Sequence, residues 1–175
     1  QGDLGRSITV LKALSLLTDE LKNRKVVVFG ADEEVQRYIN GNKKLSEFEI
    51  QVFPKKDFLP HEEILKLMGK ALIYIGNSVS DGMPNTLLEA IVMGAFPIQS
   101  NPGNATEEVI MHQKNGLLIS NCEDVIHIKN LILIASNSSG LIGSAFRTNQ
   151  NDLKPKFEYE RLKNHVLKAY KTIEV

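Results

Sequence analysis

The chain has 175 residues, of which 42% are hydrophobic, so it is long enough to bury one core and is expected to form a single domain over residues 1–175. Lys plus Arg and Asp plus Glu both number 21, and this balance excludes a global positive field that would attract nucleic acid or an anionic membrane. The single cysteine, Cys122, excludes an internal disulfide framework and favours a reducing compartment.

Membrane-spanning and secretory patterns are not seen in the sequence. No apolar run approaches the roughly 20 residues needed to span a bilayer, and no signal-peptide pattern opens the chain. We therefore expect a cytoplasmic protein without a transmembrane segment. Because the chain starts at Gln1 rather than Met and runs directly into helical periodicity, we also expect it to be part of something larger.

Short apolar strands alternate with helices along the chain. In the first half, hydrophobic spacing and Gly or Pro punctuation predict a helix over 4–22, a strand over 25–30, a helix over 31–40, a strand over 48–53 and a helix over 60–69. In the second half they predict a strand over 71–78, a helix from Pro84 to Gly94, a strand over 95–100, a short helix over 106–113, a strand over 115–120 and a helix over 124–136. The small residues of 137–143 predict a loop, and a last helix is expected over about 156–173.

This alternation is typical of βαβ units. It predicts an α/β fold with a Rossmann-like, doubly wound, mostly parallel sheet that is covered by helices on both faces. Because the chain opens on a helix, the strand that should precede this helix and form the middle of the sheet is expected to be missing or unrecognised.

The loop over 77–84, NSVSDGMP, follows a predicted strand and leads into a predicted helix. Ligands of open parallel sheets bind at such loops, outside the carboxyl ends of the strands. Gly82 lets a ligand approach the backbone closely, and Pro84 is suited to the first helical turn. The free amides from Asn85 to Leu87 then predict an anion site that suits a phosphate.

Two carboxylates flank this predicted anion site. On a helical wheel, Asn85, Thr86 and Glu89 share one face, so Glu89 lies on the side of the opening and can accept hydrogen bonds from a vicinal diol such as ribose. Asp81 can do the same for a hydroxylated group beyond the phosphates. The pattern suits a nucleotide diphosphate that carries a sugar, although spacing alone equally allows Asp81 to be a turn residue and Glu89 a solvated helix position.

An ordered set of motif positions runs through this region for about 40 residues and is far more specific than a lone Gly-rich loop. The positions are Asp81 and Glu89, the loop Gly82-Met83-Pro84-Asn85 between them, then Leu87-Leu88-Glu89-Ala90, Gly94, Pro97, Glu107 or Glu108, and Asn115-Gly116-Leu117-Leu118. The set strongly resembles the C-terminal, donor-binding domain of retaining glycosyltransferases with the GT-B fold, glycosyl transferases group 1 or family 4 type, which include sucrose and glycogen synthases.

The resemblance implies roles for individual residues. Asp81 would be the catalytic carboxylate, which holds the hydroxyls of the donor sugar. The family usually has the longer Glu at this position. Glu89 would bind the ribose. Arg6 is a possible counterpart of the family's diphosphate-binding Arg, and the base would lie near 54–57. The remaining donor-binding positions, mainly through backbone amides, would be Gly82, Met83, Pro84, Asn85 and Thr86.

The resemblance also implies a reaction. The family transfers a sugar from a nucleotide diphosphate sugar, here expected to be a UDP- or GDP-sugar, to an acceptor with retention of configuration, usually without metal and without a cofactor. The histidines His61, His112, His127 and His165 form no pair at metal-ligand spacing and are expected to be surface or satisfied residues.

The resemblance further implies a partner, the N-terminal domain of the same full-length chain, which would supply the pocket for an acceptor that the sequence does not identify. We expect the present chain to be the donor-binding half, inactive in isolation. One alternative is a nucleotide-binding or interaction module without transferase activity, and another is a different GT-B enzyme such as an epimerase or a phosphorylase.

Overall fold

Parallel strands form two separate ladders in this computed structural model, which describes residues 6–22, 24–80 and 82–173. The first ladder pairs β1 (Lys25–Ala31) with β2 (Glu49–Pro54), and in the second β4 (Phe96–Ser100) lies between β3 (Ile73–Gly76) and β5 (Leu117–Ile119). Every pairing is parallel, which confirms the α/β class expected from the sequence. In the described part of the chain no ladder joins β1 to β3.

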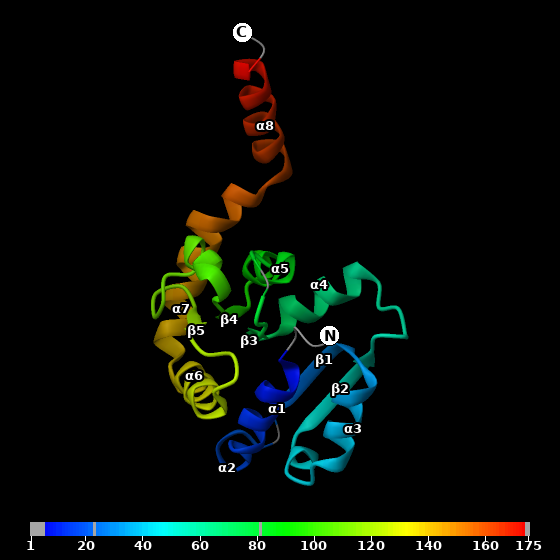
Figure 1. Cartoon of the computed structure of the whole chain (residues 1–175). Helices are drawn as coiled ribbons and strands as arrows, with labels where there is room; N and C mark the ends of the chain where they lie inside the picture. The colour runs from blue at the N-terminus through cyan, green and yellow to red at the C-terminus, as the bar shows by residue number, and fades with distance from the viewer. Residues whose placement is uncertain (1–5, 23, 81, 174–175) are drawn as a thin grey trace.

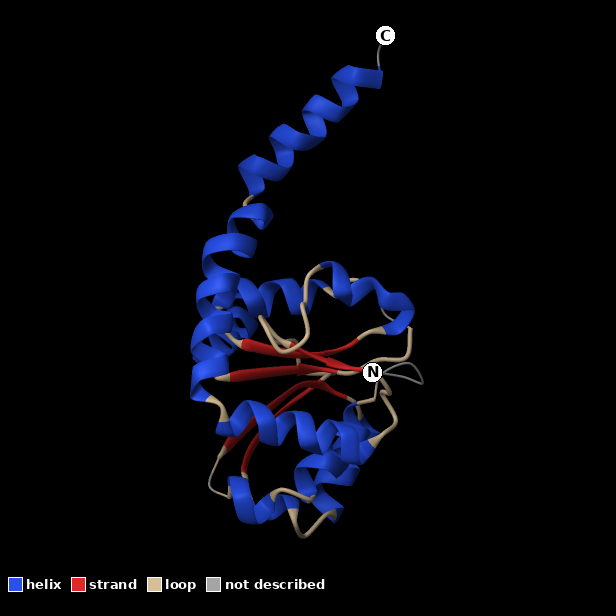
Figure 2. Cartoon of the chain, turned by 90° about the vertical axis from the view of Figure 1, so that its left-hand side faces the viewer, coloured by secondary structure: helices blue, strands red, loops and turns tan. Residues whose placement is uncertain are grey.

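Helices connect the strands, as the alternating pattern predicts. Before β3 they are α1 (Ser7–Ser15), α2 (Thr18–Leu21), α3 (Glu33–Gly41), the 3₁₀ turn η2 (Leu45–Glu47) and α4 (His61–Lys70). After β3 they are α5 (Asn85–Met93), the 3₁₀ segment η3 (Pro102–Glu108), α6 (Val125–Asn137), α7 (Ser139–Thr148), the π-helical segment η4 (Asn149–Leu153), the 3₁₀ turn η5 (Lys154–Phe157) and α8 (Tyr159–Ile173). Figure 2 shows helices on both sides of the strands.

Alternate side chains of the second ladder face two different hydrophobic clusters. Ile98 of β4 and Leu117 of β5 pack in the main core with residues of α1, α6 and α7. Tyr74 of β3 and Leu118 of β5 belong instead to a cluster around Leu87 of α5. Since neighbouring residues of a strand face opposite sides of a sheet, this division shows that helices cover both faces, as the sequence predicts.

The helix predicted over 4–22 is interrupted in the structure. α1 ends at Ser15 and α2 begins at Thr18, and residues 4 and 5 lie outside the described residues. The Ser15 hydroxyl donates to the carbonyl of Lys12, so a side chain competes with the backbone ladder at this point. The turn lets Leu17 reach the core, where it is fully buried.

The loop predicted over 137–143 is wrong, because α7 begins at Ser139. Among the small residues of this segment are apolar side chains at helical spacing. These are Leu141, Ile142 and Ala145, which all pack in the main core. Burial of these side chains outweighs the weak helix propensity of Ser and Gly, which is only about 0.5–1 kcal/mol per residue below that of Ala.

The short helix predicted over 106–113 is displaced toward the N-terminus, to η3. Asn101 accepts a hydrogen bond from the Thr106 amide through its side chain and so holds this 3₁₀ segment. Beyond it, the Asn115 side chain accepts from the Met111 amide, so that backbone donor is satisfied outside a helix. Residues 109–116 therefore contain a turn over 113–115, closed by an isolated bridge between His112 and Gly116, instead of a helix.

The last described element is a helix that projects from the body of the molecule (Figures 1 and 2). α8 follows η5 and confirms the last helix predicted from the sequence. Among the described helices, none is by itself long and apolar enough to cross a membrane. One pair of helical segments has the length and hydropathy of a membrane span only when the two are taken together. The pair is Val125–Asn137 and Ser139–Phe157, and the chain bends by 87° between them.

Candidate functional site

The candidate site lies at the carboxyl ends of the strands. In a parallel ladder these ends meet at one edge, and the loop over 77–84 leaves this edge after β3 and enters α5. Asp81, the first acid of the predicted pair, lies outside the described residues. Gly82 is exposed, and a Cβ on it would meet no atom within 4 Å, so its backbone is open to a ligand.

The N-terminus of α5 offers fewer free amides than the sequence predicts. Pro84 is the N-cap residue rather than part of the first turn, and its carbonyl accepts from the amides of Leu87 at 3.1 Å and Leu88 at 3.4 Å. Leu87 is therefore not a free donor, which corrects the expected set. For the amides of Asn85 and Thr86, no acceptor is recorded among the residues that the structure describes.

The side chains at the start of α5 divide between core and opening. Leu87 and Ile91 are fully buried, whereas Asn85 is exposed, as the helical wheel predicts. The Thr86 Oγ1 accepts a hydrogen bond from the Tyr74 hydroxyl at 2.9 Å, so Thr86 can still donate its own proton. Met83 packs against the apolar cluster around Leu87, so its side chain takes part in the fold.

Glu89 occupies the second turn of α5 beside the start of α4. Its carboxylate Oε1 lies 2.8 Å from Nε2 of His61, the first residue of α4. The Glu89 side chain is 26% exposed and that of His61 is 64% exposed. Glu89 is therefore a sheltered carboxylate that solvent can still reach, rather than the fully solvated helix position that the sequence also allowed.

Arg6 is brought to the beginning of the candidate loop. Its backbone amide donates to the Asn77 carbonyl at 3.0 Å, and the Asn77 side chain donates to the carbonyls of Arg6 and Cys122. The guanidinium Nε donates to Glu123 Oε1 at 2.9 Å. Since Glu123 follows β5, Arg6 links the loops after β3 and β5, and its charge faces a carboxylate in this structure.

The loop expected to hold a base follows β2 and leads into α4. Two of its amides are already used within the fold, because Lys55 donates to the Ala31 carbonyl at 2.8 Å and Asp57 donates to the Pro54 carbonyl at 3.1 Å. If the backbone of residues 54–57 contacts a base, the contacts would therefore come from the carbonyls and from the Lys56 amide.

Several supporting residues carry no motif signal in the sequence. His61 is exposed and hydrogen-bonded, as expected of a surface or satisfied histidine, but the sequence does not indicate that its partner is Glu89. Asn77, Glu123 and Ser100 have no sequence signal either. Ser100 accepts from the Ser78 amide through its hydroxyl and so ties the candidate loop to β4. These contacts join residues distant in the sequence, and no motif position in the sequence signals them.

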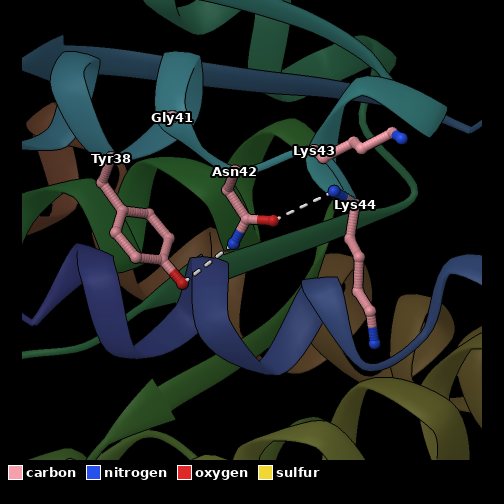
Figure 3. A pocket seen from close by; sticks show the side chains of 5 residues that line it. All are labelled: Tyr38, Gly41, Asn42, Lys43 and Lys44. Atoms are coloured by element: carbon pink, nitrogen blue, oxygen red, sulfur yellow. Dashed lines mark hydrogen bonds between the residues drawn. The ribbon is translucent and has the colours of Figure 1, made fainter.

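A hollow elsewhere on the surface does not form part of this site (Figure 3). Tyr38, Asn42, Lys43 and Lys44 line it, between the end of α3 and the start of β2. Asn42 donates to the Tyr38 hydroxyl, and its side-chain oxygen accepts from the Lys44 amide. The hollow is thus next to the amino end of β2, at the opposite edge from the loop over 77–84.

Several solved structures have a similar fold. A glycosyltransferase from Rickettsia africae is 20% identical with a TM-score of 0.72, over 95% of this chain and 44% of that chain. Anabaena Alr3699/HepE in complex with UDP-glucose is 13% identical with a TM-score of 0.75, over 98% and 46%. Staphylococcus aureus TarM, a mutant solved with Fondaparinux, alpha-GlcNAc-glycerol and UDP, is 14% identical with a TM-score of 0.73, over 96% and 33%.

These likenesses define the class of fold as that of a GT-B glycosyltransferase domain, as the sequence resemblance implied. The chain spans less than half the length of each of these three proteins. The sequence pattern of the family described as glycosyl transferases group 1 matches residues 7–152, which is most of the chain. The chain therefore belongs to the glycosyl transferases group 1 family.

Proposed function

We propose that this chain binds a nucleotide diphosphate sugar as the donor for a glycosyl transfer. The observation that carries the proposal is the sheltered Glu89 carboxylate on α5, one turn beyond the open amides of Asn85 and Thr86. An anion-binding helix start beside an acceptor for a diol matches a diphosphate joined to ribose. Family membership and the UDP and UDP-glucose complexes of proteins with this fold support the same ligand class.

Each residue of the site has a proposed role. Glu89 accepts hydrogen bonds from the ribose hydroxyls, and the backbone over 82–86 donates to the diphosphate. Asp81 holds the hydroxyls of the donor sugar. Arg6 balances phosphate charge, and its ion pair with Glu123 keeps it beside the loop until the donor arrives.

The transfer itself is proposed for a longer protein. The chain spans 44% and 46% of two of the solved glycosyltransferases, which supports a second domain that supplies the acceptor pocket. Such a protein would transfer the sugar with retention, with the leaving diphosphate stabilised by the helix start and Arg6 rather than by a metal. By itself the chain would bind the donor without transferring the sugar.

Calorimetric titration of the chain with UDP, GDP and their glucose conjugates tests this proposal. We expect one nucleotide to bind selectively, and Glu89→Ala to weaken this binding by about 1–3 kcal/mol, because the mutation removes hydrogen bonds made by a charged group. Asp81→Ala should reduce the preference for the nucleotide sugar over the bare nucleotide. Glu20→Ala is the matched control, since Glu20 is an exposed helix residue that precedes β1 and so lies away from the carboxyl ends of the strands.

Two results would contradict the proposal. A wild-type chain that binds neither nucleotide nor either conjugate is not a donor-binding domain as it stands. A Glu89→Ala chain that binds as tightly as the Glu20→Ala chain removes Glu89 from the site.

A further inference from the structure

The bond between His61 and Glu89 connects two helices that start at the same edge of the fold. His61 is the first residue of α4, which follows β2, and Glu89 belongs to α5, which follows β3. Their side chains meet at 2.8 Å although 28 residues separate them in the sequence. A carboxylate only accepts hydrogen bonds, so the His61 Nε2 is the donor.

This pair is poorly suited to a role in stability. The His61 side chain is 64% exposed, and exposed pairs of polar or charged side chains contribute little to folding because both side chains are well solvated when apart. Glu89 is the more sheltered partner, at 26% exposed. The main consequence of the bond is therefore orientation, because it holds a flexible glutamate in one position.

The bond also leaves the carboxylate able to bind a ligand. A carboxylate has two oxygens and about four lone-pair positions, and His61 uses one of them. Within the described ranges, no other hydrogen bond to the Glu89 side chain is recorded. The second oxygen and the remaining lone pair of Oε1 can together accept from two neighbouring hydroxyls.

We propose that His61 is a positioning residue for donor binding, which holds the Glu89 carboxylate in the orientation that accepts both ribose hydroxyls of the nucleotide. This inference rests on the proposed function of the same site. A side chain that is ordered before binding does not lose its conformational freedom when the ligand arrives. His61 thus selects for ribose, through Glu89, over a sugar that lacks the 2′-hydroxyl.

A pair of substitutions at position 61 separates hydrogen bonding from packing. In His61→Gln, the amide nitrogen can donate in place of Nε2, whereas His61→Leu has a side chain of similar size without a donor. We expect His61→Leu to bind UDP roughly three- to tenfold more weakly, the effect of one side chain that must be ordered on binding. His61→Gln should stay within about twofold of the wild type.

The ratio of the affinities for UDP and 2′-deoxy-UDP is a readout that a purely structural role of His61 would not change. If the titrations show that the chain selects guanine, GDP and 2′-deoxy-GDP replace this pair. His61→Leu should weaken the ribonucleotide but change the deoxynucleotide by less than about twofold, because the deoxynucleotide forms fewer bonds with Glu89. In a Glu89→Ala background, His61→Leu should cause no further loss.

Each contrary outcome contradicts either this inference alone or the proposed function as well. If His61→Leu weakens both nucleotides equally, or neither, while Glu89→Ala still weakens the ribonucleotide, His61 does not position Glu89 and this inference alone is overturned. If His61→Gln fails to rescue binding while its melting temperature equals that of the wild type, the donor role is also wrong. If the wild type binds no nucleotide, the proposed function falls and this inference falls with it.

Discussion

At the residue scale, the position of the candidate loop depends on Gly76, the last residue of β3. A Cβ on Gly76 would overlap the side-chain amide of Gln99, which is 2% exposed and therefore unable to swing aside into solvent. The Oε1 of Gln99, for which no partner is recorded among the described residues, already fills the space at Gly76. The loop to Asp81 starts directly after this close contact.

Gly76→Ala should therefore destabilise the chain by about 1–3 kcal/mol, the usual cost of overpacking a filled interior. Urea denaturation followed by circular dichroism measures the change. Gly82→Ala is the control in the same loop, and its free energy of unfolding should lie within about 0.5 kcal/mol of the wild type because its Cβ meets open space. Equal stabilities for the two variants would show that Gln99 can move.

At the element scale, two buried asparagines join the turn before β5 to η4. Asn115 donates to the Asn149 side chain, and Asn149 donates to the Asn115 carbonyl, both at 3.0 Å. Asn115 also accepts from the Met111 amide. Both asparagines are at most 2% exposed, so water does not replace these bonds. The Asn-Gly motif of the family thus has a structural use in this chain.

Asn149→Ala should lower the free energy of unfolding by about 1–3 kcal/mol, because it removes the buried partner of the Asn115 carbonyl and of one of the two Asn115 side-chain N–H groups, the other of which still has the Val109 carbonyl. Thermal and urea unfolding both report this loss. Asn130→Ala, an exposed asparagine on α6, is the control and should change stability by less than about 0.5 kcal/mol. If the Asn149 variant matches this control, the buried pair does not stabilise the turn.

At the scale of the whole molecule, one hydrophobic core joins the two ladders. Val28 of β1 and Val52 of β2 pack in the same cluster as Ile75 of β3 and Ile98 of β4. The ladders share no recorded strand pairing in the described residues, so apolar burial rather than backbone hydrogen bonding links them. The His61–Glu89 bond adds a second link at the carboxyl ends, between the helices that follow β2 and β3.

A shared core predicts a single cooperative unfolding transition, in which circular dichroism and tyrosine fluorescence change together. The nucleotide that binds should raise the midpoint by roughly 5–10 °C at a concentration near 100 times its dissociation constant, since it then stabilises the fold by about 2.7 kcal/mol. Glu89→Ala should lose most of this shift. Two separate transitions, with only the second ladder responding to nucleotide, would show that the ladders fold independently.

The elements of the fold were largely predictable because they depend on local patterns. Apolar runs that end at Gly or Pro marked the strands, and Pro84 and Gly94 marked α5 closely. The break in the first helix and the helical state of 139–148 were not predictable, because they depend on what the core buries. Leu17 and Ala145 are fully buried only when α1, α6 and α7 meet.

By itself, the sequence determined the α/β class, the place of the candidate loop before α5, and the face of that helix that carries Glu89. These properties follow from residue spacing, which the backbone geometry of helices and strands converts directly into direction. Only the tertiary structure decided that Glu89 meets His61 and that Arg6 meets Glu123. These two contacts join residues 28 and 117 positions apart, and local spacing carries no information about such partners because packing brings them together.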